Sequence, residues 1–252
     1  MSLDAIRTSE RLSAFAHIVD ASIEVLGEIS AVHRTQDDRL VALQYLSAQI
    51  MNSASAALSV LLSGYYQQSS LLQRHMIEVG FLLDYLRTNP DRLKAWLTSY
   101  AGFSPPGFGT GKLIGRLDQR DHTPGGGRKQ TYEMLSNVGA HPTKVAWRTI
   151  MSEGYRMVGP FFNPQHLEYV LSEMSRNLPY FALVAVCAFQ REAPALSTAC
   201  DAFRTELRAW LQRCYGGFRI LLSYDDLLTE YSTKLWGRRR SVRNVRKPGR
   251  RA

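Results

Sequence analysis

Apolar side chains recur every three or four residues along much of the chain, which is the spacing of amphipathic helices. The first stripe covers residues 12–29, a second runs through Asp37–Ser63, and Gly64 is placed to end that helix. A third stripe covers Tyr66–Thr88 and includes His75, which is interpreted as a buried core histidine. Because the connection between the last two stripes is short, an antiparallel helical hairpin is expected.

Shorter helical segments are expected after this hairpin. An Asn-Pro pair at the start of residues 89–100 has the residue types of an N-cap and a first helical position. Residues 102–127 are rich in glycine and proline, which indicates a mobile segment with room for one helix near 112–120. A helix over residues 128–138 should then end at Gly139.

The remainder of the chain predicts a β-hairpin and two long helices. β-favouring residues around a Ser-Glu-Gly sequence within 146–162 favour a small hairpin. Helices follow over 164–191, with a kink at Pro179, and over 194–235, with a break at Gly216-Gly217. We therefore predict an all-α fold: a single bundle of long antiparallel helices with one small β-hairpin.

Composition narrows the class of protein without identifying a function. The chain has 252 residues, of which 45% are hydrophobic and 21% charged. This excludes disordered, collagen-like and disulfide-scaffold proteins and suits a chain long enough to bury a full core. Cys187, Cys200 and Cys214 are odd in number and lack C-x-x-C spacing, so we interpret them as small buried residues in a reducing compartment.

Two further features bear on localisation. Charged residues are scattered over residues 1–30, where a signal peptide needs an unbroken apolar stretch. The longest apolar run, Leu178–Phe189, is shorter than the roughly 18 residues needed to cross a bilayer. We interpret this run as a buried helix and expect a cytoplasmic protein.

Positive charge is concentrated at the end of the chain. Of the 31 lysine and arginine residues, eight lie within 237–252, which contains no acid, so residues 1–236 hold 23 basic against 22 acidic residues. The eight are Arg238, Arg239, Arg240, Arg243, Arg246, Lys247, Arg250 and Arg251. A segment of this composition cannot bury enough apolar surface to fold alone. We therefore predict a helical domain over 1–236 and a disordered tail over 237–252.

The tail is a candidate nucleic-acid-binding segment, because lysine and arginine neutralise backbone phosphates without reading the base sequence. Anionic membrane is the rival partner, since polybasic segments are attracted to such surfaces. Trp236 is the only large apolar anchor nearby in the sequence, and no lipidation signal follows it. Nucleic acid, either RNA or DNA, is therefore the favoured partner.

Common catalytic and cofactor motifs are absent from the sequence. Gly107–Lys112 is rich in glycine but lacks the spacing of a phosphate-binding loop. The six histidines form neither H-E-x-x-H nor a Cys/His cluster, and no G-x-S-x-G nucleophile elbow occurs. No metal and no cofactor is therefore predicted.

Two stretches place polar residues where a helical stripe should be apolar. On helices, Arg74 and Glu78 are one turn apart, as are Tyr132 and Ser136, so each pair shares a face. His141 follows just beyond the second helix and precedes a proline. If the two faces meet, these five residues form one polar cluster, which is the candidate catalytic site.

The patterns that carry these residues are L-x-R-x-x-x-E, starting at Leu72, and Y-x-x-L-S-x-x-x-x-H-P, starting at Tyr132. Together they resemble a widespread group of uncharacterised bacterial helical proteins that look HEPN-like, which means similar to the helical domains of many bacterial toxin and antiviral-defence proteins. The resemblance covers about residues 40–190. It implies a helical bundle that dimerises and binds nucleic acid.

Ribonuclease members of the HEPN class carry Arg-x(4–6)-His, in which the two side chains act on the RNA backbone at a dimer interface. The matching stretch here is Ser136–His141, with serine where that arginine belongs. Arg74 on the neighbouring helix is the candidate to supply the missing guanidinium, since it can bind phosphate through two hydrogen bonds.

These observations leave different classes of function open. The leading hypothesis is a HEPN-like nucleic-acid-binding protein of bacterial defence or toxin-antitoxin type, acting as a homodimer, with or without ribonuclease activity. The alternative is a non-enzymatic helical interaction or dimerisation module, in which the Arg-Glu-Tyr-Ser-His cluster is structural. A further hypothesis is an enzyme that acts on a small molecule in a loop-lined cleft.

Overall fold

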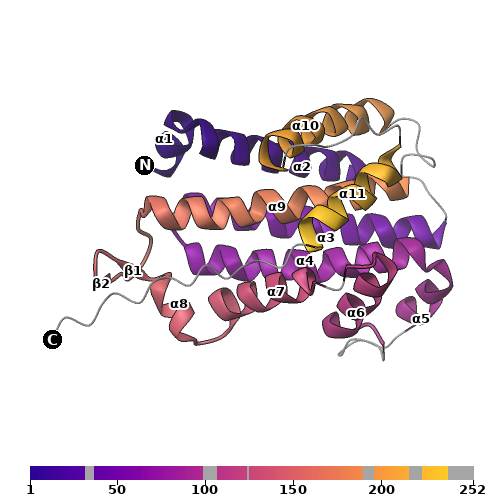
Figure 1. The fold of residues 1–252 in the computed structure, drawn as a ribbon, viewed down its shortest axis with the longest axis horizontal. Helices are drawn as coiled ribbons and strands as arrows, with labels where there is room; N and C mark the ends of the chain where they lie inside the picture. The colour runs from indigo at the N-terminus through magenta and orange to yellow at the C-terminus, as the bar shows by residue number, and fades with distance from the viewer. Residues whose placement is uncertain (32–36, 99–106, 124, 190–195, 216–222, 238–252) are drawn as a thin grey trace.

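The computed structural model describes residues 1–31, 37–98, 107–123, 125–189, 196–215 and 223–237 (Figure 1). Its helices are α1 (Ser2–Thr8), α2 (Glu10–Ala31), α3 (Asp38–Leu62), α4 (Tyr66–Thr88), the 3₁₀-helix η1 (Pro90–Arg92), α5 (Leu93–Leu97), α6 (Thr110–Arg120), α7 (Gly127–Leu135), the π-helix η2 (Ser136–Ala140), α8 (Lys144–Arg148), α9 (Pro164–Phe189), α10 (Ser197–Tyr215) and α11 (Tyr224–Trp236). Two short strands, β1 (Met151–Ser152) and β2 (Tyr155–Arg156), pair antiparallel. The predicted all-α fold with one small β-hairpin is confirmed.

The predicted helical hairpin is formed by α3 and α4, and local sequence defines its ends. The Asp37 side chain caps α3 by accepting hydrogen bonds from the backbone N–H groups of Arg39 and Leu40, at 2.7 and 3.4 Å. Gly64 turns the chain into α4 with a φ of +85°, and a Cβ there would collide with the carbonyl oxygen of Phe161. This corner therefore requires glycine.

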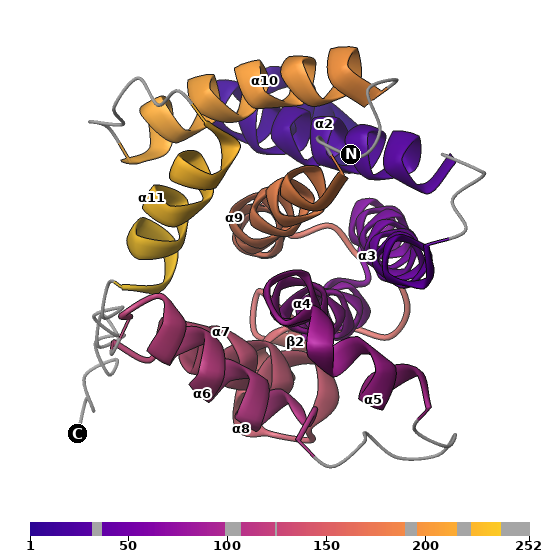
Figure 2. The ribbon, with the colours of Figure 1, turned by 90° about the vertical axis from the view of Figure 1, so that its right-hand side faces the viewer.

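The centre of the bundle is α9, which α2, α3, α4, α10 and α11 surround (Figure 2). Side chains are buried around nearly its whole circumference over Leu178–Phe189, which explains why this run is apolar without a helical period. The expectation of a buried helix is thus confirmed. Pro179 lies within α9 and does not end it.

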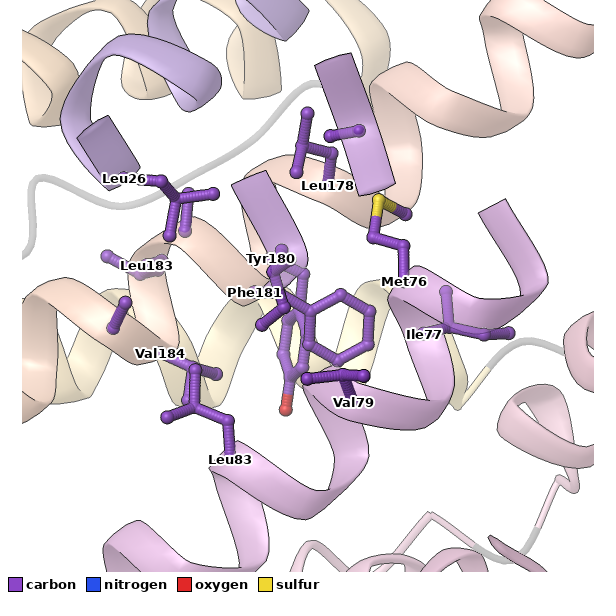
Figure 3. Close-up of a cluster of buried hydrophobic side chains, with 14 of the residues drawn as sticks. Leu26, Met76, Ile77, Val79, Leu83, Leu178, Tyr180, Phe181, Leu183 and Val184 are labelled. Atoms are coloured by element: carbon purple, nitrogen blue, oxygen red, sulfur yellow. The ribbon is translucent and has the colours of Figure 1, made fainter. Parts of the chain in front are cut away.

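Close packing of α4 against α9 forms part of the core (Figure 3). Phe181 of α9 lies beside Val79 of α4, and Leu26 of α2 joins the same cluster of buried side chains. Gly80 permits this approach, because a Cβ at that position would collide with the Phe181 ring. In this part of the core, helices from the first half of the chain thus pack against a helix from the second half.

The small hairpin follows α8 and leads into α9 at one end of the bundle (Figure 1). Its turn residues, Glu153 and Gly154, both have positive φ, 50° and 86°. This is the pattern of a two-residue type I′ turn, whose twist suits paired strands. The turn lies in the predicted Ser-Glu-Gly sequence.

Two predictions about burial are wrong. His75 is exposed, because the buried face of α4 follows Met76 and Ile77 and position 75 falls on the other side of the helix. Cys200 is buried as expected, but Cys214 is exposed near the end of α10. The first error arises because helical spacing defines a stripe without defining its width, and the second because the burial of Cys214 was inferred from residue type alone.

Details at helix ends also differ from expectation. The Asn89 side chain does not cap the helix that follows it, but donates to the carbonyl oxygen of Tyr85 at 2.8 Å. The helix predicted to end at Gly139 continues to Ala140 as the π-helix η2. The predicted break at Gly216-Gly217 lies outside the described residues.

Candidate functional site

The two predicted polar faces meet between α4 and α7. Arg74 donates from Nη2 to Glu78, one turn further along α4, at 2.8 Å. The same nitrogen donates to the Tyr132 hydroxyl at 2.8 Å, and Nε donates to Ser136 Oγ at 3.0 Å. The guanidinium also lies over the Tyr132 ring, 5.1 Å from its centre. These four residues are named the Arg74 cluster.

The π-helix η2 brings Ser136 onto α4. Its wide turn is closed by the His141 N–H, which donates to the Ser136 carbonyl oxygen at 3.0 Å. Gly139 lies against the α4 backbone, where a Cβ would stand 2.5 Å from the amide nitrogen of Leu71. The lack of a side chain at residue 139 therefore permits the contact that places Ser136 beside Arg74.

His141 is the candidate residue that remains outside the Arg74 cluster. It is exposed, and its ring makes no hydrogen bond within the part of the chain that the structure describes. Its backbone is extended, because the ring of Pro142 disfavours the α conformation at the preceding residue. The structure thus brings four of the five candidate residues together and leaves the imidazole in solvent.

The contacts of the Arg74 cluster suit the binding of a ligand or the docking of one helix on another. Arg74 and Glu78 are 25% and 24% exposed, so solvent reaches the ion pair, and Glu78 balances the arginine charge. Ser136 accepts its hydrogen bond from Arg74, and among the described residues no base contacts its hydroxyl to activate it as a nucleophile. Within the same residues, Nη1 of Arg74 makes no hydrogen bond, which leaves its donors for an outside acceptor.

A second polar group, which the sequence did not lead us to expect, surrounds Arg128 at the start of α7. Arg128 is fully buried and donates hydrogen bonds to five side chains from α6, the turn after α6, α9 and α11. Its partners are Asp118 (2.7 Å), Asp121, Thr123 (3.1 Å), Tyr180 (3.4 Å) and Ser232 (3.1 Å). With Asp84 and Arg120, these residues are named the Arg128 network.

Asp84 extends this network to α4. Arg120 donates to both Asp84 carboxylate oxygens, at 2.8 and 3.0 Å, and Tyr180 donates to the same carboxylate at 2.9 Å. Arg120 also donates twice to Asp121, at 2.5 and 3.0 Å. The network therefore ties α6 and α7 to the central helices.

The arginines set the ionisation of this network. Burial raises the pKa of Asp84, but the charge of Arg120 more than reverses the shift, and the pKa lies below its usual value. Burial also raises the pKa of Asp121, and the hydrogen bond from Arg120 with the charge of Arg128 brings it down to about 2. Arg120 and Arg128 together contact all three aspartates, and Arg87 adds a further cation 3.9 Å from Asp84, so each of these charges has a partner within the protein, which indicates a structural role.

One signal in the sequence points to this network. Asp84 is the only charged residue in the otherwise apolar and aromatic run Phe81–Leu86, and a carboxylate at a buried position requires a cation. The sequence does not say which arginine supplies that cation. Arg120 and Asp121, which belong to the segment 102–127 that we expected to be mobile, both take part in these contacts.

Comparison of the chain with protein-family models, curated proteins and solved structures gives no match. Among the described helices, none combines the length and the apolar character that a membrane crossing requires. Within the same residues, no group of three or more histidine, cysteine, aspartate or glutamate side chains is arranged to hold a metal ion. The candidate nucleic-acid-binding residues of the tail, Arg238 to Arg251, lie outside the described residues. The functional argument therefore starts from the geometry of the chain itself.

Proposed function

We propose that the protein is a HEPN-like nucleic-acid-binding protein of bacterial defence or toxin-antitoxin type, whose contact surface is residues 141–156 beside the Arg74 cluster. The observation that carries this proposal is the exposure of large aromatic rings in that segment. Trp147 on α8 is 64% exposed and Tyr155 on β2 is 75% exposed. We name this segment the Trp147 surface.

Basic residues accompany these rings. Lys144, Arg148 and Arg156 are all exposed, and Glu153 is the one acid in residues 141–156. Exposed rings with basic neighbours suit single-stranded nucleic acid, because bases stack on the rings while cations neutralise the phosphates. Such a surface tolerates many sequences, since every base has a flat face.

The Trp147 surface continues into the Arg74 cluster through η2, against which α8 packs. Arg74 offers the unused donors of Nη1 to a phosphate, and the exposed imidazole of His141 can exchange a proton with RNA. In this proposal, nuclease activity depends on His141, because the Arg74 cluster itself contains no base positioned against Ser136. RNA binding alone does not need His141.

RNA binding by the full-length protein tests the proposal. Trp147→Ala should weaken binding of single-stranded RNA by about 5- to 150-fold, the effect of losing about 1–3 kcal/mol of base stacking. Tyr45→Ala is the matched control, because Tyr45 is an aromatic residue of α3 that is 56% exposed and lies outside this surface. Equal affinity of Trp147→Ala and wild-type protein would contradict the proposal.

A truncation to residues 1–236 measures the contribution of the basic tail in the same assay. A tail that makes five to eight phosphate contacts should give a slope of log K against log salt near −4 to −7 on duplex DNA, at about −0.9 per contact. The truncated protein should lose most of this slope. Cleavage of mixed RNA by purified wild-type protein but not by His141→Ala would assign ribonuclease activity, whereas binding without cleavage would assign a non-catalytic protein.

A second candidate function is a non-enzymatic dimerisation module, and exposed aliphatic side chains favour it. Val158 is 99% exposed and Val145 is 47% exposed, both close in sequence to Trp147. Analytical ultracentrifugation over a concentration series tests this function. Val158→Asp should dissociate such a dimer, whereas Val41→Asp, which changes a 46% exposed valine of α3, should not. A monomer at all concentrations would exclude it.

A further inference from the structure

Helices α2 and α10 lie on the opposite side of α9 from α7 (Figure 2). A pocket lies between the start of α2 and the end of α10. Arg176 of α9 and Lys234 of α11 complete its lining, and its volume is about 640 Å³. We name it the α2–α10 pocket. Sites for small molecules have volumes of about 300–1,000 Å³, so the pocket is large enough for a ligand of some 20 to 30 heavy atoms.

Aromatic and apolar side chains form part of this lining. Phe15 of α2, Trp210 of α10 and Leu235 of α11 all line the pocket and are buried. The Trp210 ring meets the ring of Tyr215 edge to face, with the centres 5.9 Å apart. Rings fixed in this way give a planar ligand an apolar surface to pack on without a further loss of side-chain entropy.

The lining also carries an excess of positive charge. Four basic residues face one acid, Glu10. The basic residues are Arg11, Arg176, Arg213 and Lys234. Three of them pair with glutamates outside the pocket, at 2.7, 3.4 and 3.7 Å, whereas Arg213 forms no ion pair with any described residue. The pair of Arg11 with Glu168 is well exposed and therefore weak, and Arg176 is 40% exposed, so Arg11, Arg176 and Arg213 can contact an anion in the pocket.

The neighbouring hollow limits the length of that anion. It shares Arg213 and Glu10 with the pocket and adds Glu206 and Arg7 to the lining, so it carries no excess of arginine over glutamate. Glu206 lies 3.4 Å from His17 and has no other cation this close among the described residues. A polyphosphate or nucleic-acid strand that continued along α10 would meet two carboxylates as well as two arginines, so it would gain little net attraction there. The charge pattern therefore suits a small anion.

We propose that the α2–α10 pocket binds a mononucleotide-sized molecule in which a phosphate group is joined to a planar aromatic ring. The phosphate binds at Arg213 with help from Arg11 and Arg176, because guanidinium groups hold phosphate through paired hydrogen bonds. The ring packs on Trp210. This proposal does not depend on nucleic-acid binding at the Trp147 surface, since the two sites share no residue.

Calorimetric titration of the full-length protein with each of the four ribonucleoside monophosphates tests the proposal. The matching nucleoside and inorganic phosphate are the comparisons, and at least one monophosphate should bind more tightly than both, because it alone engages the rings and the cations together. Arg213→Gln should weaken this binding by about tenfold or more, as expected for the loss of one charge-assisted contact. Lys94→Gln, which removes an exposed lysine of α5 outside both the pocket and the Trp147 surface, should leave it unchanged.

Cys214 provides a second readout, since this exposed thiol lines the pocket. Its reaction with a thiol reagent should slow when the monophosphate is bound, and Arg213→Gln should abolish that protection. The proposal is overturned if none of the four monophosphates binds at millimolar concentration or if inorganic phosphate binds equally well. Binding that survives Arg213→Gln also overturns it and would place the interaction elsewhere, at the Trp147 surface or the basic tail.

Discussion

Replacing Arg128 by methionine removes the guanidinium that holds five side chains together inside the bundle. Methionine keeps an apolar stem but loses the guanidinium that lies over the Trp236 ring. Among the described residues, it leaves Asp118 without a cation and Asp121 with Arg120 alone. Breaking a buried ion pair in this way costs about 3–5 kcal/mol, because Asp118 loses its cation and Asp121 loses one of its two arginines while both stay largely buried. This is a large fraction of the roughly 5–15 kcal/mol by which such a domain is stable.

Urea unfolding followed by circular dichroism measures this loss. With a denaturant slope of about 3 kcal/mol per molar, the midpoint of Arg128→Met should fall by about 1–2 M. Lys129→Met is the matched control on the same helix, since the Lys129 side chain is 68% exposed and its contact with Glu133 is 3.7 Å long. That control should change stability by no more than about 0.5 kcal/mol.

A double variant separates the network from simple loss of packing. Adding Asp121→Asn to Arg128→Met removes a carboxylate that has lost one of its two arginine partners, so the double variant should be less destabilised than the sum of the single changes by about 1–3 kcal/mol. Additive losses would show that Arg128 and Asp121 are not coupled. A midpoint for Arg128→Met equal to that of Lys129→Met would refute the whole account of a buried ionic network.

Further predictions concern pH, packing and thiol chemistry. Because the folded pKa of Asp121 is about 2, below the ordinary 3.8, its carboxylate stabilises the fold above about pH 4 and loses this effect as pH falls toward 2. Between pH 4 and pH 2, the free energy of unfolding of Asp121→Asn should therefore fall by about 1–2 kcal/mol less than that of the wild-type protein. Buffered urea titrations in which both proteins lose the same free energy over this range would contradict the prediction. Gly139→Ala should cost about 1–3 kcal/mol, because its Cβ would press on the Leu71 amide nitrogen, and an unchanged melting temperature would disprove the close contact. Burial raises the pKa of Cys200 to about 11, so a thiol reagent at neutral pH should modify the exposed Cys214 first. Mass spectrometry of the native protein shows the order of labelling, and early modification of Cys200 would count against its burial.

The positions of the long helices follow from the sequence because each one buries a stripe against the same core. Leu12 and Ile29, at the ends of the first predicted stripe, are both buried in α2. The Arg74 cluster was predictable for a similar reason, since spacing of four residues places Arg74 and Glu78 on one face wherever the helix forms. Patterns of this kind need no knowledge of the tertiary fold.

Contacts between distant elements do not leave such a pattern. Ser232 donates a hydrogen bond to Asp121, which lies 111 residues earlier in the sequence. Nothing in the sequence around either residue indicates its partner. Gly139 has the appearance of a helix end, whereas the structure uses its small size to admit the backbone of α4. The position of His141 likewise depends on where η2 ends, and this π-helix is set by packing on α4. These features require the folded arrangement to be known.

The central place of α9 also governs the order in which a newly made chain can fold. Helices α2, α3 and α4 leave the ribosome about 100 residues before α9 is complete. At about 5–20 residues per second, that delay lasts about 5–20 s. During this time the faces that carry Leu26 and Met76 have no central helix to cover them. The nascent N-terminal half therefore exposes apolar surface that chaperones bind. Translation that stops before residue 164 should yield an aggregation-prone fragment, because it lacks the central helix α9.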